Sequence, residues 1–200
     1  MSNTSFSSAI FLSTFVALAA FQSLRQRKGS KTDESSEKIY FPPLPPVIVN
    51  VLKLSKLCFL ATNNLSEPHL SLMNFTYYQE EECLILCTRK DTKKYQQIKN
   101  NPKIAVLIHD FPHLAATDGD ENHGKTFSVT LNGYCEVYDA GNSRSEKYRN
   151  IHLTNNPNYS QFICGNDIAV IKIFIEKARI CDFNDKVSYW NNKDGVTCSE

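Results

Sequence analysis

A run of cations and hydroxyl groups over residues 87–102 is the most distinctive chemical pattern in the sequence. The stretch reads CTRKDTKKYQQIKNNP and places four cations within six residues, with Thr88 and Thr92 interleaved. The cations are Arg89, Lys90, Lys93 and Lys94. Two interpretations are open from this stretch alone. Either the cations are solvated and partly neutralised by Asp91, or the lysines, hydroxyls and backbone amides bind an anion such as phosphate.

The residues that follow place this cluster at the start of a helix. Asp91 or Thr92 can act as its N-cap, and the helix should end near Asn100 because a proline two residues later cannot continue it. Lys93 and Lys94 then lie in the first turn. The helix dipole already supplies about half a positive charge there, so each added cation costs roughly 0.3 to 1 kcal/mol at an exposed site. A bound anion would remove this cost.

Length and composition describe an ordinary globular domain. The chain has 200 residues, of which 42% are apolar and 22% charged, and its formal charge is +1. This charge gives no overall bias toward nucleic acid, so any anion site must be local. The seven cysteines form no C-x-x-C pair and lie mostly in apolar runs, which predicts buried reduced thiols in a cytoplasmic domain. The histidines lack metal-ligand spacing, so no metal site is predicted.

The first 40 residues differ in composition from the rest. Residues 1–28 contain the apolar run AIFLSTFVALAAF followed by RQRK. Two interpretations stay open for this segment. It is a membrane anchor or targeting sequence over residues 6–24 with the domain facing the cytosol, or an extension, since thirteen apolar residues are fewer than the roughly 20 that span a bilayer. Residues 29–40 have the polar composition of a linker.

The folded domain is predicted over residues 41–183, with residues 184–200 as a C-terminal tail. Besides the cation-rich helix, helices are predicted at 46–55 and 143–153. Strand periodicity marks six segments: 58–63, 68–78, 83–88, 103–110, 126–139 and 167–183. About six mostly antiparallel strands with inserted helices predict a mainly β fold, a small barrel.

Three of these strands carry more specific expectations. Residues 68–78 and 83–88 are separated by a short polar turn and should form a long hairpin. Residues 103–110 read KIAVLIHD, a composition that predicts burial on both faces. The strand at 126–139 alternates well but should be interrupted near Gly133.

The order and spacing of several motifs resemble the pyridoxamine 5'-phosphate oxidase-like family of FMN-binding split barrels. The motifs are LAT in the first strand, PH with alternation in the second, the hydroxyl and basic cluster, and NNPKIAVLI. The match is strongest from Leu57 to Asp110 and extends more weakly to Phe183. The resemblance implies an FMN-binding split β-barrel that forms a homodimer with the flavin between subunits.

The resemblance also implies which positions contact FMN. Thr92, Lys93 and Lys94 match the positions that hold the FMN phosphate. The other matching positions lie on the second strand, at the end of the third and on a later strand: Leu72, Met73, Asn74, Phe75, Tyr77, Cys87, Thr88 and Ser128.

Two departures from the family pattern shape the expected function. Members that oxidise pyridoxamine phosphate carry an arginine near the position of Leu72, and a C-terminal tryptophan with an arginine-histidine motif. Here Trp190 is followed by no arginine or histidine. The expected function is therefore an FMN-binding flavoprotein, an oxidoreductase on a small substrate other than a full pyridoxamine phosphate oxidase. The alternative is a non-catalytic split-barrel binding or scaffold protein that has lost FMN. No catalytic residue is assigned.

Overall fold

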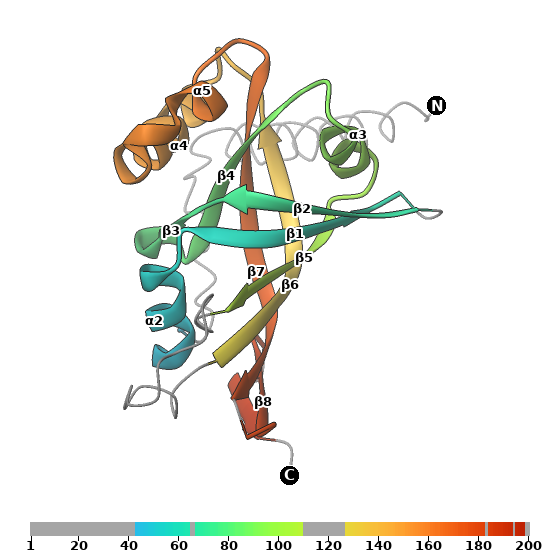
Figure 1. The fold of residues 1–200 in the computed structure, drawn as a ribbon, viewed down its shortest axis with the longest axis vertical. Helices are drawn as coiled ribbons and strands as arrows, with labels where there is room; N and C mark the ends of the chain where they lie inside the picture. The colour runs from blue at the N-terminus through green and yellow to red at the C-terminus, as the bar shows by residue number, and fades with distance from the viewer. Residues whose placement is uncertain (1–42, 65–66, 110–126, 183, 194, 199–200) are drawn as a thin grey trace, which may run out of the picture. The chain divides into compact units, whose positions relative to one another are not determined.

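Residues 43–64, 67–109, 127–182, 184–193 and 195–198 are described by a computed structural model. Their strands form one antiparallel sheet in the order β2-β1-β5-β6-β7-β4-β3, which β8 and β9 extend from β7 (Figure 1). The predicted mainly β split-barrel fold is therefore confirmed. The predicted apolar segment and linker lie outside the described residues. Within the described residues, no helix is both long and apolar enough to cross a membrane.

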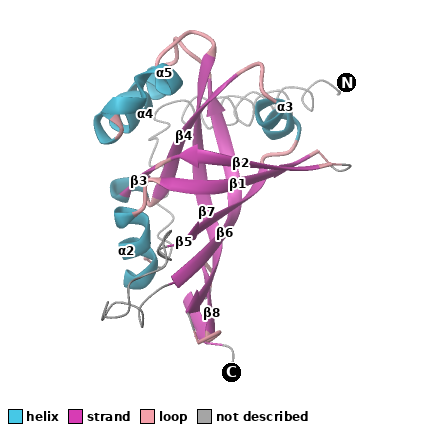
Figure 2. Ribbon diagram, in the orientation of Figure 1, coloured by secondary structure: helices cyan, strands magenta, loops and turns pink. Residues whose placement is uncertain are grey.

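Strands make up most of the described elements, and four helices accompany them (Figure 2). The strands are β1 Leu57–Asn63, β2 Pro68–Asn74, β3 Thr76–Tyr78, β4 Cys83–Arg89, β5 Lys103–His109, β6 Phe127–Tyr138, β7 Ile168–Asp182, β8 Val187–Asn191 and β9 Gly195–Cys198. The helices are α2 Pro46–Leu54, α3 Lys93–Asn100, α4 Ser143–Asn155 and α5 Ser160–Ile163, with 3-10 turns η1 Gln79–Glu81 and η3 Pro157–Tyr159. The three predicted helices and most predicted strands are confirmed.

The predicted strand at 68–78 is broken at Phe75, and this break closes the barrel. β2 pairs with β1 along its whole length, whereas β3 pairs with β4. Phe75 lies between them with its side chain 1% exposed in the core, and its amide donates to the carbonyl of Lys56 at 3.2 Å. The predicted long hairpin is therefore wrong for residues 68–74, because a buried aromatic residue turns the chain between the two ends of the sheet.

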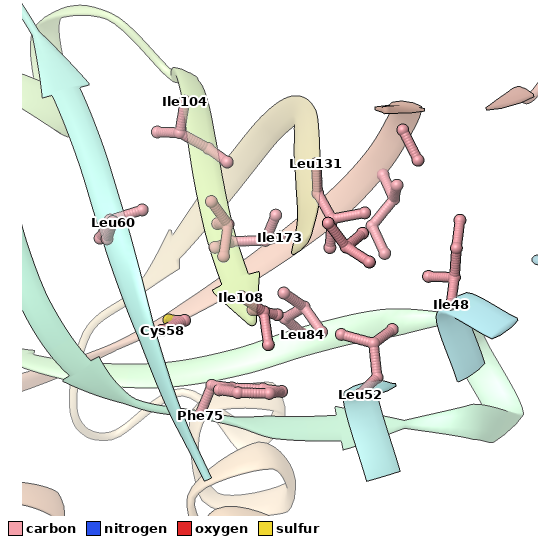
Figure 3. Close-up of a cluster of buried hydrophobic side chains, with 14 of the residues drawn as sticks. Ile48, Leu52, Cys58, Leu60, Phe75, Leu84, Ile104, Ile108, Leu131 and Ile173 are labelled. Carbon is pink, nitrogen blue, oxygen red and sulfur yellow. The ribbon is translucent and has the colours of Figure 1, made fainter. Parts of the chain in front are cut away.

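The main core fills the interior of the curled sheet. Alternate residues of the strands point inward, and α2 adds its own apolar side chains, Ile48 and Leu52 among them (Figure 3). Pro46 occupies the first turn of α2, where its missing N–H costs nothing. A sheet closed in this way leaves few unpaired edges, and the helix covers apolar side chains that would otherwise face water.

β4 is buried on both faces, whereas β5 is not. Leu84 and Leu86 face the main core. Ile85 and Cys87 face a second apolar cluster beneath α4 and α5. On β5, by contrast, alternate residues are accessible, and Leu107 is 38% exposed. The prediction that 103–110 is buried on both faces is therefore wrong, because helices cover the outer face of β4 but not that of β5.

The C-terminal residues continue the sheet past residue 183, where the sequence placed the end of the domain. β8 pairs with β7, and β9 pairs with β8. Trp190 of β8 is 3% exposed and belongs to the main core. Residues 187–191 therefore pack as part of the domain rather than as a tail.

β6 and β7 form the longest pair of the sheet, and their register shifts between Asn132 and Gly133. Gly133 is opposite Ile175, and a Cβ atom there would lie 1.9 Å from the carbonyl oxygen of Phe174. The obstacle is backbone and cannot move aside as a side chain can. The predicted interruption near Gly133 is confirmed, and its cause is this close approach of two strands.

Substituting Gly133 should therefore destabilise the barrel. Gly133→Ala forces β6 and β7 apart, and we expect the free energy of unfolding to fall by about 1–3 kcal/mol or more, as for other overpacked interiors. Urea unfolding measures this loss. Asn132→Ala, at the adjacent exposed position, is the control and should change stability by less than about 0.5 kcal/mol. Equal stability of the two variants would show that the strands separate without cost.

Candidate functional site

A cavity of about 340 Å³ lies between β2, the C-terminal end of β4, the start of α3 and the α4–α5 region. Seven of the predicted FMN-contacting residues line it: Leu72, Met73, Asn74, Cys87, Thr88, Thr92 and Lys94. They come from three segments that are separate in the sequence. The fold thus brings together most of the predicted site, and its volume is at the lower end of the range for small-molecule and cofactor sites.

The other four predicted residues lie elsewhere. Phe75 is in the main core, and Tyr77 packs against that core, where burial raises the pKa of its hydroxyl to about 12. Lys93 points away to form an ion pair with Glu67, with Nζ and Oε1 2.6 Å apart. Ser128 lies opposite His109 on β6, on the face turned away from the buried Val129. Within a single chain these four do not reach the cavity.

Lys94 differs from the other three cations of the cluster. Arg89 pairs with Asp91 at 2.7 Å, Lys90 with Asp139 at 3.4 Å and Lys93 with Glu67. Lys94 lines the cavity, is half-buried and has no acidic partner among the described residues. Burial lowers the pKa of its ammonium group. The folded chain therefore keeps one desolvated cation without a counter-charge at this position.

The start of α3 adds backbone and hydroxyl groups to this end of the cavity. Thr92 is the N-cap, since its Oγ1 accepts from the amide of Tyr95 at 3.4 Å. The same hydroxyl donates to the carbonyl of Arg89 at 2.8 Å. Thr88 Oγ1 lies 3.1 Å from Thr92 Oγ1. Because Thr92 donates its proton to the Arg89 carbonyl, the Thr88 hydroxyl is the better placed to turn toward a ligand.

The opposite wall of the cavity comes from helices that the motif analysis did not include. His152 of α4, Tyr159 of η3 and Phe162 and Ile163 of α5 line it. Tyr159 and Phe162 are 41% and 59% exposed, so aromatic surface is available at the cavity. The cavity thus has a basic end at α3 and an aromatic end at α5.

The sequence contains a periodic pattern that marks this wall, but polar residues carry it instead of apolar ones. α4 buries four polar side chains, at positions separated by three, four and seven residues from the first: Ser145, Tyr148, Arg149 and His152. That spacing is the period of one helix face, but it is normally sought among apolar residues. A periodic polar stripe on an otherwise charged helix would have identified His152.

His152 is 1% exposed, and polar neighbours hold its ring. Its Nδ1 lies 2.9 Å from Thr76 Oγ1 and 3.3 Å from Asn156 Nδ2. Burial lowers the pKa of the imidazole to about 4, so the ring is neutral at neutral pH. Across the cavity, the buried amide nitrogen of Asn74 has no hydrogen-bond partner in the described structure.

Arg149 and Glu81 fix α4 against the sheet. The Arg149 guanidinium donates to the backbone carbonyls of Ile163 and Ile168, at the end of α5 and the start of β7. Glu81 accepts from Tyr148 at 2.8 Å and from Lys172 at 2.5 Å. It also accepts from Lys147 of α4 at 2.6 Å. These bonds join α4 to β7 and to the turn before β4.

The arrangement favours an anionic ligand rich in acceptors. The basic end supplies an ammonium group and hydroxyls, and the far end supplies the Asn74 amide and the His152 ring. Among the described side chains that line the cavity, none is a carboxylate. Among all the described residues of the chain, no three His, Cys, Asp or Glu side chains lie close enough together to hold a metal ion.

The fold and this cavity define a split-barrel protein with a basic, donor-lined cavity. The model of the pyridoxamine 5'-phosphate oxidase family matches residues 44–180, and the chain belongs to this family. A pyridoxamine 5'-phosphate oxidase homolog of Schizosaccharomyces pombe is 36% identical over 193 residues, which cover 84% of this chain and 98% of that protein.

Solved structures with the same fold include proteins named for binding different cofactors. A heme binding protein from Mycobacterium smegmatis has a TM-score of 0.58 at 15% identity, and the match covers 74% of this chain and 59% of that one. An FAD-binding protein from Mesorhizobium loti has a TM-score of 0.53 at 16% identity, covering 66% and 88%. These identities show the fold alone, so the residues of the cavity must decide the ligand.

The Glu81 cluster generates a prediction about pH. Burial opposes ionisation of Glu81, but hydrogen bonds from Lys147, Lys172 and Tyr148 outweigh it and lower its pKa from 4.5 to about 2. Because the folded-state pKa is depressed, the carboxylate stabilises the fold above its ordinary pKa, and this contribution is lost as the pH falls through about 2. We expect Glu81→Gln to cost about 1.5–3 kcal/mol at neutral pH, the range for hydrogen bonds to charged groups.

Urea unfolding of wild type and Glu81→Gln across the acid range tests this prediction. The difference in stability should shrink as the pH falls from 4.5 toward 2. Glu80→Gln is the matched control, because the adjacent Glu80 is exposed and bonds to the Tyr78 hydroxyl rather than to a lysine. A difference between wild type and Glu81→Gln that is independent of pH would contradict the ionic role.

Proposed function

We propose that this protein binds FMN in the cavity, with the phosphate at the Lys94 end and the isoalloxazine ring toward α5. The observation that carries this proposal is Lys94, a half-buried cation without an acidic partner among the described residues, in the first turn of α3. A phosphate there would meet the ammonium group, the Thr88 hydroxyl and the positive end of the helix dipole together. The anion interpretation of the cluster is thus proposed for Lys94, whereas Arg89, Lys90 and Lys93 pair with carboxylates.

The rest of the cavity suits the ring of FMN. The ring is planar, with apolar faces and a polar edge of carbonyl oxygens and nitrogens. Leu72, Tyr159 and Phe162 offer large apolar side chains that are 58%, 41% and 59% exposed, and they would bury the faces. Asn74 and His152 supply polar atoms for the edge. A flavin is also in keeping with the FAD-binding protein among the structural neighbours.

The proposed activity is electron transfer to or from a small substrate. When bound, FMN supplies the redox chemistry, and the protein supplies position and electrostatics. Leu72 offers no charge where family members that oxidise pyridoxamine phosphate carry an arginine, so a substrate without a second phosphate fits better. A non-catalytic split-barrel protein is the alternative, and a bound flavin that no electron donor reduces would favour it.

We also propose a homodimer that forms through the outer face of the sheet. Directly paired residues point to the same side, and the outer face of β2, β1 and β5 is apolar. Its side chains are Leu57, Phe59, Ala61, Leu70, Leu72, Ala105 and Leu107. All four leucines in this set are at least 38% exposed. A contiguous exposed apolar face of this kind marks an interaction site.

The proposed dimer would also explain how Ser128, which lies outside the cavity, could contact the flavin. Ser128 lies on the outer face of β6, opposite His109 and beside the apolar face. It cannot reach the cavity of its own chain, but it would lie at the interface, where the family places the flavin. Leu72 belongs both to the apolar face and to the cavity wall, so the interface and the site are continuous.

The cysteines support a reducing compartment. All six cysteines whose side chains are described are free thiols, and burial raises the pKa of Cys58, Cys83, Cys87 and Cys135 to about 12. Such thiols are unreactive packing groups. We therefore propose a domain that faces the cytoplasm.

The two lysines of α3 provide a matched pair for testing the cofactor. Lys94→Ala removes one charge-assisted contact and should weaken FMN binding by about 1.5–3 kcal/mol, or about 10- to 150-fold. Lys93→Ala removes a surface ion pair and should change affinity less than about fivefold. Quenching of flavin fluorescence measures both. Riboflavin, which lacks the phosphate, should bind weakly and equally to wild type and Lys94→Ala.

Thermal melts without ligand complete this test. Lys94→Ala should be as stable as wild type or more stable, because it removes a desolvated cation near the positive end of a helix. Opposite signs for binding and stability distinguish a ligand site from a structural contact. Wild type that does not bind FMN, or a Lys94→Ala variant with unchanged affinity, would refute the proposed phosphate site.

A charge on the apolar face should separate the proposed dimer. Leu107→Glu places a carboxylate on β5 in the centre of the interface, and we expect a monomer by sedimentation velocity, because an unpaired charge is costly to bury. Leu54→Glu is the control, since Leu54 is 81% exposed and lies on α2 outside the sheet. A wild-type monomer, or a Leu107→Glu dimer, would contradict this interface.

A further inference from the structure

We propose that His152 recognises an acceptor atom of the ligand as a neutral Nε2–H donor, held in this tautomer by Thr76 and Asn156. The inference rests on the proposed ligand cavity, and it names the ligand class more closely. A heterocycle with carbonyl or ring-nitrogen acceptors fits this donor. A heme iron, which needs a free nitrogen lone pair, does not.

The backbone carbonyl of His152 determines the orientation of the Asn156 side-chain amide. The backbone carbonyl of His152 can only accept, and the Asn156 side-chain amide lies 3.1 Å from it through Nδ2. Asn156 therefore turns its NH₂ group toward this carbonyl, since its oxygen would be repelled there. The same NH₂ group lies 3.0 Å from Thr76 Oγ1, so Thr76 accepts from Asn156.

The Thr76 hydroxyl then has one proton to place. Thr76 is 6% exposed, and His152 Nδ1 lies 2.9 Å from its oxygen. A donor this deeply buried needs an acceptor, and Nδ1 is the acceptor available. The Asn156 nitrogen, 3.3 Å from Nδ1, also favours a nitrogen that accepts. Nδ1 accepts, and the ring proton of neutral His152 is on Nε2.

The Nε2–H group is therefore available to donate to a ligand in the cavity. His152 lines the cavity, and the hydrogen bonds of its ring to described residues all involve Nδ1 rather than Nε2. Burial lowers the pKa of the ring to about 4, so the group remains an uncharged donor at neutral pH. Together with the Asn74 amide, which is also without a partner in the described structure, it would meet the acceptor-bearing edge of a ligand.

This tautomer opposes ligation of a metal. To bind heme iron through Nε2, the ring proton would have to move to Nδ1, where the Thr76 hydroxyl already donates and the Asn156 amide nitrogen lies 3.3 Å away. A metal-ligating histidine normally donates from its second nitrogen to an acceptor, and here that arrangement is reversed. The polar neighbours of His152 thus distinguish between the two cofactor types that occur among proteins of this fold.

NMR on the ligand-free full chain tests the tautomer directly. We expect the ¹⁵N shifts of His152 at neutral pH to show a protonated Nε2 and an unprotonated Nδ1. Thr76→Val, which removes the hydroxyl, should weaken this preference, and Thr76→Ser should keep it. A protonated Nδ1 in wild type, or an imidazolium at neutral pH, would overturn the proposal.

Binding supplies the second measurement. His152→Phe should raise the dissociation constant for FMN about three- to tenfold, the loss of one neutral hydrogen bond. His152→Gln keeps an N–H near the position of Nε2 and should lose less. Equal losses in the two variants would overturn the donor role. If wild type does not bind FMN, the proposed cofactor fails, and the NMR result decides the His152 assignment by itself.

Hemin provides the opposite control. If hemin binds to wild type, its Soret band should be the same with His152→Gln, because His152 is a donor and not an axial ligand. A histidine-ligated spectrum that disappears in this variant would overturn the proposal.

Discussion

The turn of the chain at Phe75 is the constraint on which the rest of the structure depends. One continuous segment supplies β2 at one end of the sheet and β3 at the other, so the buried phenyl ring between them determines how the sheet curls. The curl brings the end of β2 opposite the end of β4, and those two ends make one wall of the cavity. A straight strand over 68–78 would have given a longer hairpin and no enclosed space at this position.

The second requirement is that β4 be covered on both faces. Its apolar run places Leu84 and Leu86 in the barrel, and Ile85 and Cys87 beneath α4 and α5. The helices that bury the outer face of β4 also bring His152 and Phe162 to the cavity. Packing and the lining of the cavity are thus coupled, because the polar stripe of α4 can meet its hydrogen-bond partners only where the helix lies on the sheet.

Local patterns predicted more of this protein than did long-range ones. The N-cap at Thr92 and the end of α3 at Asn100 depend on residues close in sequence, and both are confirmed. The interruption near Gly133 is also confirmed, because a glycine within a strand signals a close backbone approach even when the partner strand is unknown. The partners of residues 68–74 and the exposure of β5 depend on what lies beside a strand, which an apolar run does not specify. His152 was missed because the buried face of its helix is polar rather than apolar, and because its partner Thr76 is distant in the sequence.

The fold withdraws two cations from water, one at the cavity and one behind α5. Lys94 lines the cavity, Arg149 is buried outside its lining, and neither has a carboxylate partner in the described part of the chain. Arg149 satisfies its donors with backbone carbonyls, which leaves its net charge uncompensated. Such groups lower the stability of the free protein, and the packing of the two apolar clusters must offset them. An anionic ligand would be attracted to these cations without their having to reorganise. The binding free energy would therefore not be reduced by a cost of reorganisation.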